Sequence, residues 1–163
     1  MRPDALPGAA KDQLNLVLSF FPRVDSKASV VLAVDTAMLG YLAAKIPHVR
    51  WPASWDTTVP SVAFILIFGS LWHLYRTAFP TLKGGNHSLI YFKEIAVRTE
   101  SKFIDEFAGL SELDYSKELL GQVWRNSQIL TEKFHHLEIA FLFMAVSVVP
   151  WTVALVQFAM KSP

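Results

Sequence analysis

The side chains most suited to chemistry in this 163-residue sequence are two adjacent histidines, His135 and His136, flanked by Glu132 and Glu138. Glu132 precedes the two histidines by three and four residues, and Glu138 follows His135 by three. Residues at these spacings lie on one face of a helix, where they could share a metal ion. However, the sequence HHLE is not a zinc-protease motif, and no third ligand with suitable spacing is evident. The chain also lacks a G-x-S-x-G motif, a Walker lysine motif and any cysteine. We therefore predict no enzyme activity, no catalytic residue, no metal and no cofactor.

Asp35 is the one acidic residue in an otherwise uncharged stretch between Lys27 and Lys45. If this stretch is a membrane helix, Asp35 lies about 12 Å into the bilayer, where an unpaired charge costs about 2.5–3.5 kcal/mol. The same depth in two other apolar stretches falls near Ser70 and Ser147, so we expect both hydroxyls to be able to hydrogen-bond Asp35. The three residues would either line a pore or gate, or form a protonated or hydrogen-bonded packing contact.

Three charge-poor stretches would position these residues, and each is long enough to cross a bilayer, which takes about 20 mostly apolar residues. The composition agrees, with 52% apolar and 18% charged residues. We predict an all-α membrane protein with transmembrane helices at 27–46, 57–76 and 137–160, after a cytoplasmic N-terminal helix at 1–26. That first segment lacks the pattern of a secretory signal. A net charge of +1 gives no case for nucleic acid as a partner.

The distribution of lysine and arginine predicts how the chain is oriented. Four of these residues lie up to and including Lys27, where the first span begins, eight lie from Arg76 to Lys133, and only Lys161 follows the third span. By the positive-inside rule, the N-terminus and the segment 77–136 face the cytoplasm, and the C-terminus is periplasmic or extracellular.

The segment 77–136 is the only part outside the spans that is large enough to recognise a soluble ligand, and we predict that it senses and oligomerises. A loop is expected at 81–88 and a short helix at 99–110. Ser111 and Asp114 have the spacing of a helix cap, and no proline follows until Pro150, which predicts one helix of about 48 residues and about 70 Å. Apolar and small residues recur along it as in a coiled-coil seam, at Leu113, Ser116, Leu120, Val123, Ser127, Leu130, Phe134, Leu137, Phe141 and Met144. The seam would pack against a second copy of the chain or against its own neighbours, and the residues expected to support oligomerisation are Leu120, Val123, Leu130 and Phe134.

Several runs of the sequence resemble the Pycsar-type transmembrane effectors of bacterial antiphage defence. The similarity covers about residues 12–160 and rests on the order of three runs: 25–29 (DSKAS) before Asp35, 91–95 (YFKEI), and 119–134 (LLGQVWRNSQILTEKF) before the last apolar helix. The resemblance implies a protein of the bacterial inner membrane that responds to a cyclic pyrimidine mononucleotide, cyclic UMP or cyclic CMP, made by a partner cyclase. Its response would impair the membrane and halt growth, as in abortive infection.

A cyclic nucleotide offers a phosphate and an aromatic base, so its site needs a cation or N–H donors and a flat side chain. About 60 cytoplasmic residues leave no room for a separate nucleotide-binding β-roll. The expected ligand-binding residues are Lys83, Asn86, His87, Tyr91, Lys93 and Arg98. Alternatively, these are solvated cations beside a core aromatic pair. A constitutive small channel or transporter subunit, and a scaffold that recruits a soluble partner, remain open as other functions.

Overall fold

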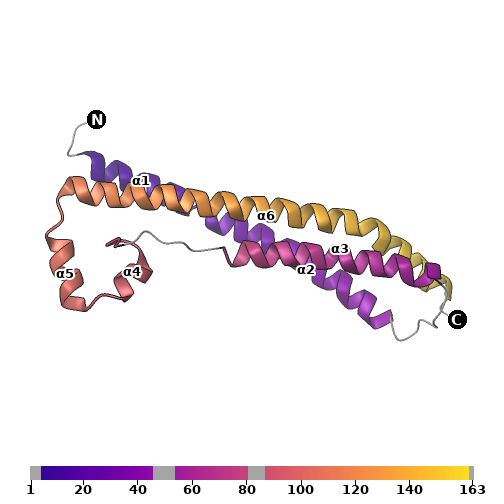
Figure 1. Cartoon of the computed structure of the whole chain (residues 1–163). Helices are drawn as coiled ribbons and strands as arrows, with labels where there is room; N and C mark the ends of the chain where they lie inside the picture. Colours follow the sequence, from indigo (N-terminus) through magenta and orange to yellow (C-terminus); the bar gives the residue numbers. More distant parts are fainter. Residues whose placement is uncertain (1–4, 46–53, 81–86, 162–163) are drawn as a thin grey trace. The chain divides into compact units, whose positions relative to one another are not determined.

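The computed structural model describes residues 5–45, 54–80 and 87–161, and all regular structure within these ranges is helical (Figure 1). The helices are α1 (Leu6–Leu18), α2 (Phe21–Lys45), α3 (Ser54–Ala78), α4 (Phe92–Ala96), α5 (Glu100–Ala108) and α6 (Glu112–Lys161). Three stretches are long and apolar enough to cross a membrane, namely Leu6–Lys45, Thr57–Ala78 and Glu112–Met160. The predicted fold is confirmed: three long apolar helices, with short helices between the second and the third.

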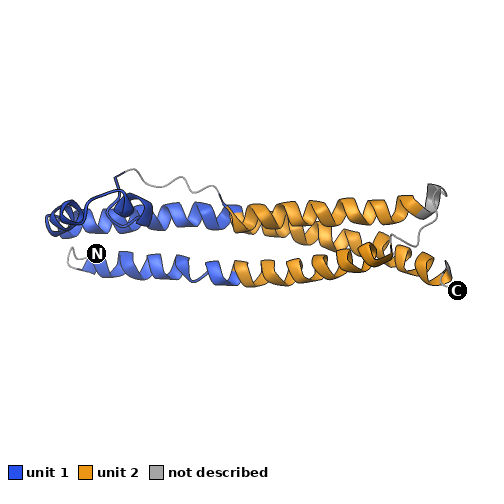
Figure 2. Ribbon diagram, turned by 90° about the horizontal axis from the view of Figure 1, so that it is seen from below, with its two compact units in different colours: residues 1–23, 80–132 blue, residues 24–79, 133–163 orange. Residues whose placement is uncertain are grey.

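The described residues divide into two compact units, which Figure 2 colours separately. The first unit takes in residues up to 23 and residues 80–132, and therefore contains α1, α4, α5 and the first part of α6. The second unit takes in residues 24–79 and 133–163, and therefore contains nearly all of α2, all of α3 and the remainder of α6.

The chain breaks between α1 and α2 because of Pro22. Proline has no N–H to donate to the carbonyl four residues earlier, and its ring clashes with that carbonyl. Just before this break, at the end of α1, the Ser19 hydroxyl donates to the Leu16 carbonyl at 2.7 Å. Helix α2 then begins at Phe21, with the proline in its first turn, where a missing N–H is harmless.

Helix α6 begins where the sequence predicts. The Asp114 N–H donates to Ser111 Oγ at 3.1 Å, and Ser111 Oγ donates to the Asp114 carboxylate at 2.7 Å. This pairing satisfies a backbone donor that the first turn of a helix leaves open. The helix then runs for 50 residues and continues through Pro150. The predicted short helix is present as α5, which is flanked by Thr99 and Gly109.

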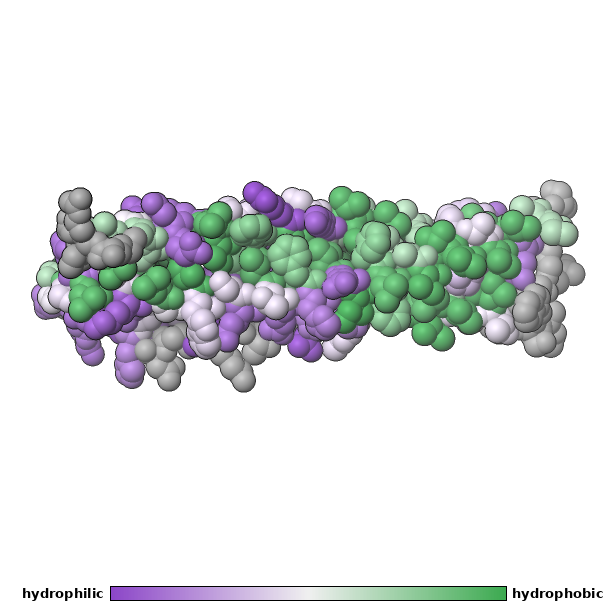
Figure 3. Space-filling view, turned by 90° about the horizontal axis from the view of Figure 1, so that it is seen from above, coloured by the Kyte–Doolittle hydropathy of each residue, from purple (hydrophilic) through white to green (hydrophobic). Residues whose placement is uncertain are grey.

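The second unit is a bundle of α2, α3 and α6 around a core of Met38, Leu42, Ala63, Ile67 and Ala154. Two of these are alanines, which allow helix backbones to approach closely, as is common in membrane bundles. Large apolar side chains also cover the outside: Ile65 is 71% exposed and Val149 69%. Figure 3 shows this broad hydrophobic face over the second unit. Such a surface suits contact with lipid chains rather than water.

The face that α6 buries differs from the predicted seam. Ser116 and Leu137 are buried as expected, but the exposed positions include Leu113, Leu120 and Phe141. The positions buried within the chain are instead Ser116, Leu119, Gln122, Lys133, Leu137, Ala140, Ser147 and Ala154. From Lys133 onward these positions are spaced by three, four or seven residues, and most of the buried positions between Leu113 and Met144 lie one residue before a position of the predicted seam. The packing of the seam against a second copy of the chain stays a prediction.

Candidate functional site

A polar contact joins all three helices of the second unit in the middle of their apolar stretches. Asp35 on α2 and Ser70 on α3 are both fully buried. The Ser70 hydroxyl lies 2.6 Å from Asp35 Oδ2 and 2.9 Å from the backbone carbonyl of Ala140 on α6, within hydrogen-bonding distance of both. The other carboxyl oxygen, Asp35 Oδ1, is buried and has no hydrogen-bond partner among the described residues. The predicted meeting of Asp35 and Ser70 is thus present in the structure.

Ser147, the third residue expected at this depth, is also fully buried, but its hydroxyl donates to the Met144 carbonyl at 2.7 Å. A serine within a helix commonly satisfies its hydroxyl on the preceding turn in this way. The structure therefore brings Asp35 and Ser70 together and leaves Ser147 bonded to its own helix.

Two histidines form a second contact between α3 and α6. His73 Nδ1 and His136 Nδ1 are 3.1 Å apart, and the His73 ring also stacks on Phe143 with the centroids 5.8 Å apart. At this distance one ring nitrogen carries a hydrogen and donates a hydrogen bond, and the other nitrogen accepts it. The sequence pointed to His136 through its neighbour His135, but it did not point to His73. The signal available was that His73 lies near the C-terminal end of the span 57–76 and His136 lies just before the span 137–160, so both histidines lie at the same predicted side of the membrane.

An ion pair ties α2 to α6 in the same unit. Lys133 Nζ lies 2.6 Å from Asp25 Oδ1; the lysine side chain is only 8% exposed, whereas that of the aspartate is 56% exposed. The long lysine stem can be buried while its ammonium reaches a carboxylate at the rim. Sequence reasoning missed this pair because 108 residues separate its members.

The first unit holds the segment for which a ligand role was predicted, and Arg98 organises it. Its guanidinium donates to the carbonyls of His87 at 2.8 Å, Ser88 at 3.1 Å and Glu94 at 2.5 Å, and it pairs with Glu106 at 2.9 Å. A guanidinium suits this task because its five N–H groups point in fixed directions. Arg98 therefore closes residues 87–98 into a compact turn, which we name the Arg98 turn.

The Arg98 turn is also attached to α6. The Ser88 hydroxyl donates to Glu118 at 2.7 Å, and Gln122 donates to the same hydroxyl oxygen at 3.2 Å. The backbone N–H of Leu89 approaches Glu118 at 3.3 Å. Two polar side chains of the long helix are thus fixed by one end of the turn.

The other expected ligand-binding residues are distributed around this turn. His87 is exposed, has a positive φ of 64°, and donates its backbone N–H to Glu94 at 3.0 Å. Lys93 is exposed on α4. Tyr91 Oη is buried and, within the part of the chain that is described, has no hydrogen-bond partner. Lys83 and Asn86 lie outside the described residues.

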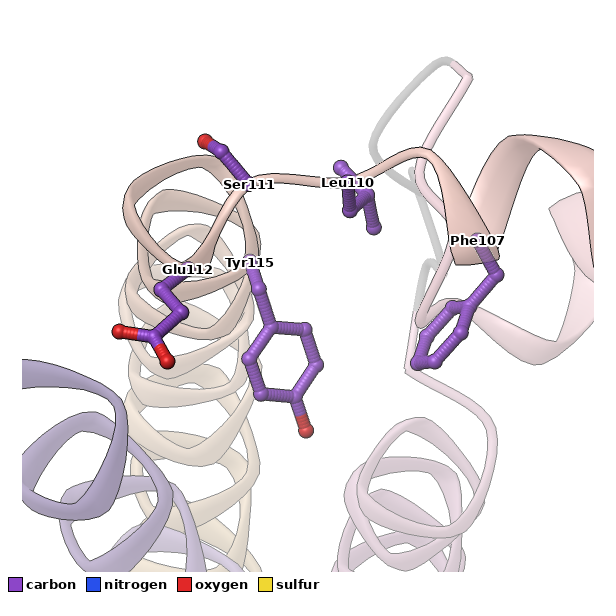
Figure 4. A pocket seen from close by; sticks show the side chains of 5 residues that line it. All are labelled: Phe107, Leu110, Ser111, Glu112 and Tyr115. Carbon is purple, nitrogen blue, oxygen red and sulfur yellow. The ribbon is translucent and has the colours of Figure 1, made fainter.

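The first unit also contains a small pocket at the junction of α5 and α6, which sequence reasoning did not identify (Figure 4). It measures about 280 Å³ and is lined by Phe107, Leu110, Ser111, Glu112 and Tyr115. The rings of Phe107 and Tyr115 meet edge to face at 6.0 Å. An available signal was the recurrence of aromatic residues just before and just after the predicted cap of α6.

The residues predicted to support oligomerisation lie along α6. Leu120 is exposed, whereas Val123, Leu130 and Phe134 are half-buried. In the second unit, Phe134 contributes to an apolar groove of about 540 Å³ between α2 and α6, lined by Lys27, Val30, Val31, Phe134, Leu137, Glu138 and Phe141.

Comparison with known proteins gives a family for this arrangement. The model of the Pycsar effector protein domain matches residues 9–159, which is nearly the whole chain and includes both the Arg98 turn and the Asp35–Ser70 contact. Comparisons with curated proteins and with solved structures found no match. The family match confirms the resemblance noted in the sequence. The chain therefore belongs to the Pycsar transmembrane effectors, the membrane effectors of an antiphage defence.

Proposed function

We propose that this effector responds to a cyclic pyrimidine mononucleotide, cyclic UMP or cyclic CMP, by impairing the integrity of the bacterial inner membrane. The observation that carries the proposal is the family match over residues 9–159, because a single effector domain takes in both the first unit and the membrane helices. The nucleotide would come from a partner pyrimidine cyclase, and the protein itself catalyses no reaction.

The proposed ligand site is the Arg98 turn. Lys93 supplies an exposed cation for the phosphate, and the rings of Tyr91 and Phe92, which meet at 5.1 Å, offer flat surfaces for the base. Tyr91 Oη adds a hydrogen-bonding group that the described residues leave unsatisfied. In this proposal Arg98 is a positioning residue, since its N–H groups already hold the backbone of the turn. The segment 77–136 that contains the site is cytoplasmic, as are the N-terminal residues.

Helix α6 provides the route from ligand to membrane. Glu118 and Gln122 bond to Ser88 at the Arg98 turn, while further along the same helix Lys133 and the Ala140 carbonyl bond to α2 and α3. A ligand that repositions the turn can therefore bias the helix, provided that it binds the two arrangements with different affinities.

The decisive binding experiment is a titration of the purified protein in detergent, followed by thermal unfolding. Cyclic UMP or cyclic CMP should stabilise the protein by about 2.7 kcal/mol at roughly 100 times the dissociation constant, because a ligand that prefers the folded state must stabilise it. Cyclic AMP serves as the purine control. Lys93→Ala should weaken the effect of the pyrimidine nucleotide without lowering the stability of the free protein. No stabilisation by either pyrimidine nucleotide would overturn the ligand assignment.

The membrane step is proposed to involve an assembly of several copies, a tetramer or larger, because three spans do not easily enclose a water-filled path. The exposed and half-buried apolar side chains of α6, including Leu120, Val123, Leu130 and Phe134, would form its contacts. Mass measurement in detergent, with and without nucleotide, tests this directly. A monomer under both conditions would contradict it.

Membrane potential in cells that also express an active cyclase reports the lesion itself. We expect Asp35→Asn to depolarise the membrane as the unaltered protein does, and Asp35→Leu to be inactive, since only the amide keeps a hydrogen-bonding group at this position. Full depolarisation by Asp35→Leu at normal protein levels would exclude an essential role for Asp35. Depolarisation without any cyclase would instead favour a constitutive channel.

A further inference from the structure

The Ser70 hydroxyl has two acceptor atoms within hydrogen-bonding distance but only one proton to give. Asp35 Oδ2 lies at 2.6 Å and the Ala140 carbonyl at 2.9 Å. A carbonyl oxygen can only accept, and an ionised carboxylate can only accept as well. With an ionised Asp35, one of these two close oxygen–oxygen contacts would lack a proton of its own.

We propose that Asp35 is a proton-binding site of the membrane bundle and that its carboxylic acid is a hydrogen-bond donor in the arrangement that the structure shows. Asp35 Oδ2–H then donates to Ser70 Oγ, and Ser70 Oγ–H donates to the Ala140 carbonyl. Every short contact in the set has one donor and one acceptor in this arrangement. The chain of two hydrogen bonds runs from α2 through α3 to α6 and links all three helices.

The unsatisfied oxygen of Asp35 leads to the same assignment. Asp35 Oδ1 is buried and lacks a partner among the described residues. On an ionised carboxylate, this would be a buried charge without a countercharge, whereas on a neutral acid it is a carbonyl oxygen with the much smaller cost of a missing hydrogen bond.

No cation in the described part of the bundle is in contact with Asp35 to compensate a negative charge. Along the sequence, the titratable or charged groups nearest to Asp35, Ser70 and Ala140 are Lys27 and Tyr41 on α2, His73 and Tyr75 on α3, and His136 and Glu138 on α6. Among residues 5–45, 54–80 and 87–161, the one hydrogen-bond partner of the Asp35 carboxyl group is Ser70. The bundle therefore holds this carboxyl group through hydrogen bonds and not through an ion pair, unlike Asp25, which pairs with Lys133.

An aspartic acid in water is ionised at neutral pH, so Asp35 keeps its proton only while the bundle holds it away from water. A carboxylate at this position would be costly in the apolar interior. This inference concerns the arrangement that the structure shows and does not depend on the identity of the ligand.

Infrared spectroscopy of the purified protein in lipid vesicles, without nucleotide, tests the proposal. A protonated carboxylic acid has a carbonyl stretching band that is separate from the carboxylate bands and shifts in heavy water. We expect this band at neutral pH in the unaltered protein, its loss in Asp35→Asn, and its retention in the matched control Asp25→Asn. An acid band of equal intensity in the unaltered protein and in Asp35→Asn, or no acid band at all, would overturn the proposal.

Ser70→Ala gives a second test that does not require Asp35 to be replaced. Removing the hydroxyl takes away the acceptor of the Asp35 proton, so the acid band should move to the higher frequency of a free acid. An acid band that stays at its original frequency would show that Asp35 does not donate to Ser70. Because both measurements are made without nucleotide, they can fail while the proposed effector function stands, and the reverse is also possible.

Discussion

Replacing Arg98 with alanine should loosen the Arg98 turn before it changes anything else in the protein. The guanidinium donates to three backbone carbonyls and pairs with Glu106. Hydrogen bonds to charged groups contribute about 1.5–3 kcal/mol each. The ion pair adds little, because Glu106 is 38% exposed and such pairs are typically worth about 0–1 kcal/mol. The loss of stability should be smaller than the sum of these values, because water can bind the freed carbonyls and all the contacts come from one side chain. We therefore expect Arg98→Ala to lower the free energy of unfolding of the turn by about 2–4 kcal/mol in total.

Hydrogen exchange measures this loss where it occurs. The amides of Glu94 and Ile95 donate to the Tyr91 carbonyl, and the Arg98 amide donates to that of Ile95. Protection of these amides should fall by about 30- to 700-fold in Arg98→Ala, because each 1.4 kcal/mol corresponds to about a factor of ten. Amides in the membrane bundle should exchange as before.

Lys93→Ala is the matched control, since it removes a cation from the same turn at an exposed position. It should change stability by no more than about 0.5 kcal/mol. If the amides of Glu94 and Ile95 keep their protection in Arg98→Ala, then the Arg98 side chain does not hold the turn. If both variants bind nucleotide as the unaltered protein does, the Arg98 turn is not the ligand site.

Three further changes test the packing of the helices, the cap of α6 and the proposed assembly. Gly69→Ala should destabilise the protein by about 1–3 kcal/mol in thermal unfolding, because the added methyl carbon would lie 2.9 Å from the Phe143 ring. Gly40→Ala is the control, since a methyl group there meets nothing within 4 Å, and equal effects of the two changes would contradict this packing. Ser111→Ala should cost about 1 kcal/mol and increase amide exchange in the first turn of α6, and unchanged exchange would mean that the cap contributes nothing. Leu130→Glu should dissociate the proposed assembly in mass measurements, because it places a charge in an apolar contact, and an intact oligomer would exclude that contact.

The sequence by itself determined the features that depend on neighbouring residues. Long apolar stretches predict membrane helices because every backbone polar group in a bilayer must be satisfied within its own helix or barrel. Ser111 and Asp114 predict the start of α6 because the cap bonds span only three residues. The continuity of α6 followed from the absence of proline before Pro150, and the helix also passes through that residue.

The expected depth of Asp35 and Ser70 also came from the sequence, because helix rise converts residue number into distance. Depth alone does not give the direction in which a side chain points, and Ser147, at a similar depth, bonds to its own helix. The register of α6 was uncertain for a related reason: apolar residues occur on several faces of a membrane helix, since lipid accepts them as readily as a protein core does.

Only the tertiary structure decided which distant residues meet. Asp25 and Lys133 are 108 residues apart, His73 and His136 are 63 apart, and no local pattern joins them. The same holds for the Ala140 carbonyl, a backbone atom that carries no sequence signal and yet lies 2.9 Å from Ser70. Local sequence sets the length and the ends of each helix, but the rotation of one helix against another follows from the packing of all three, and that rotation gave Asp35 its partner.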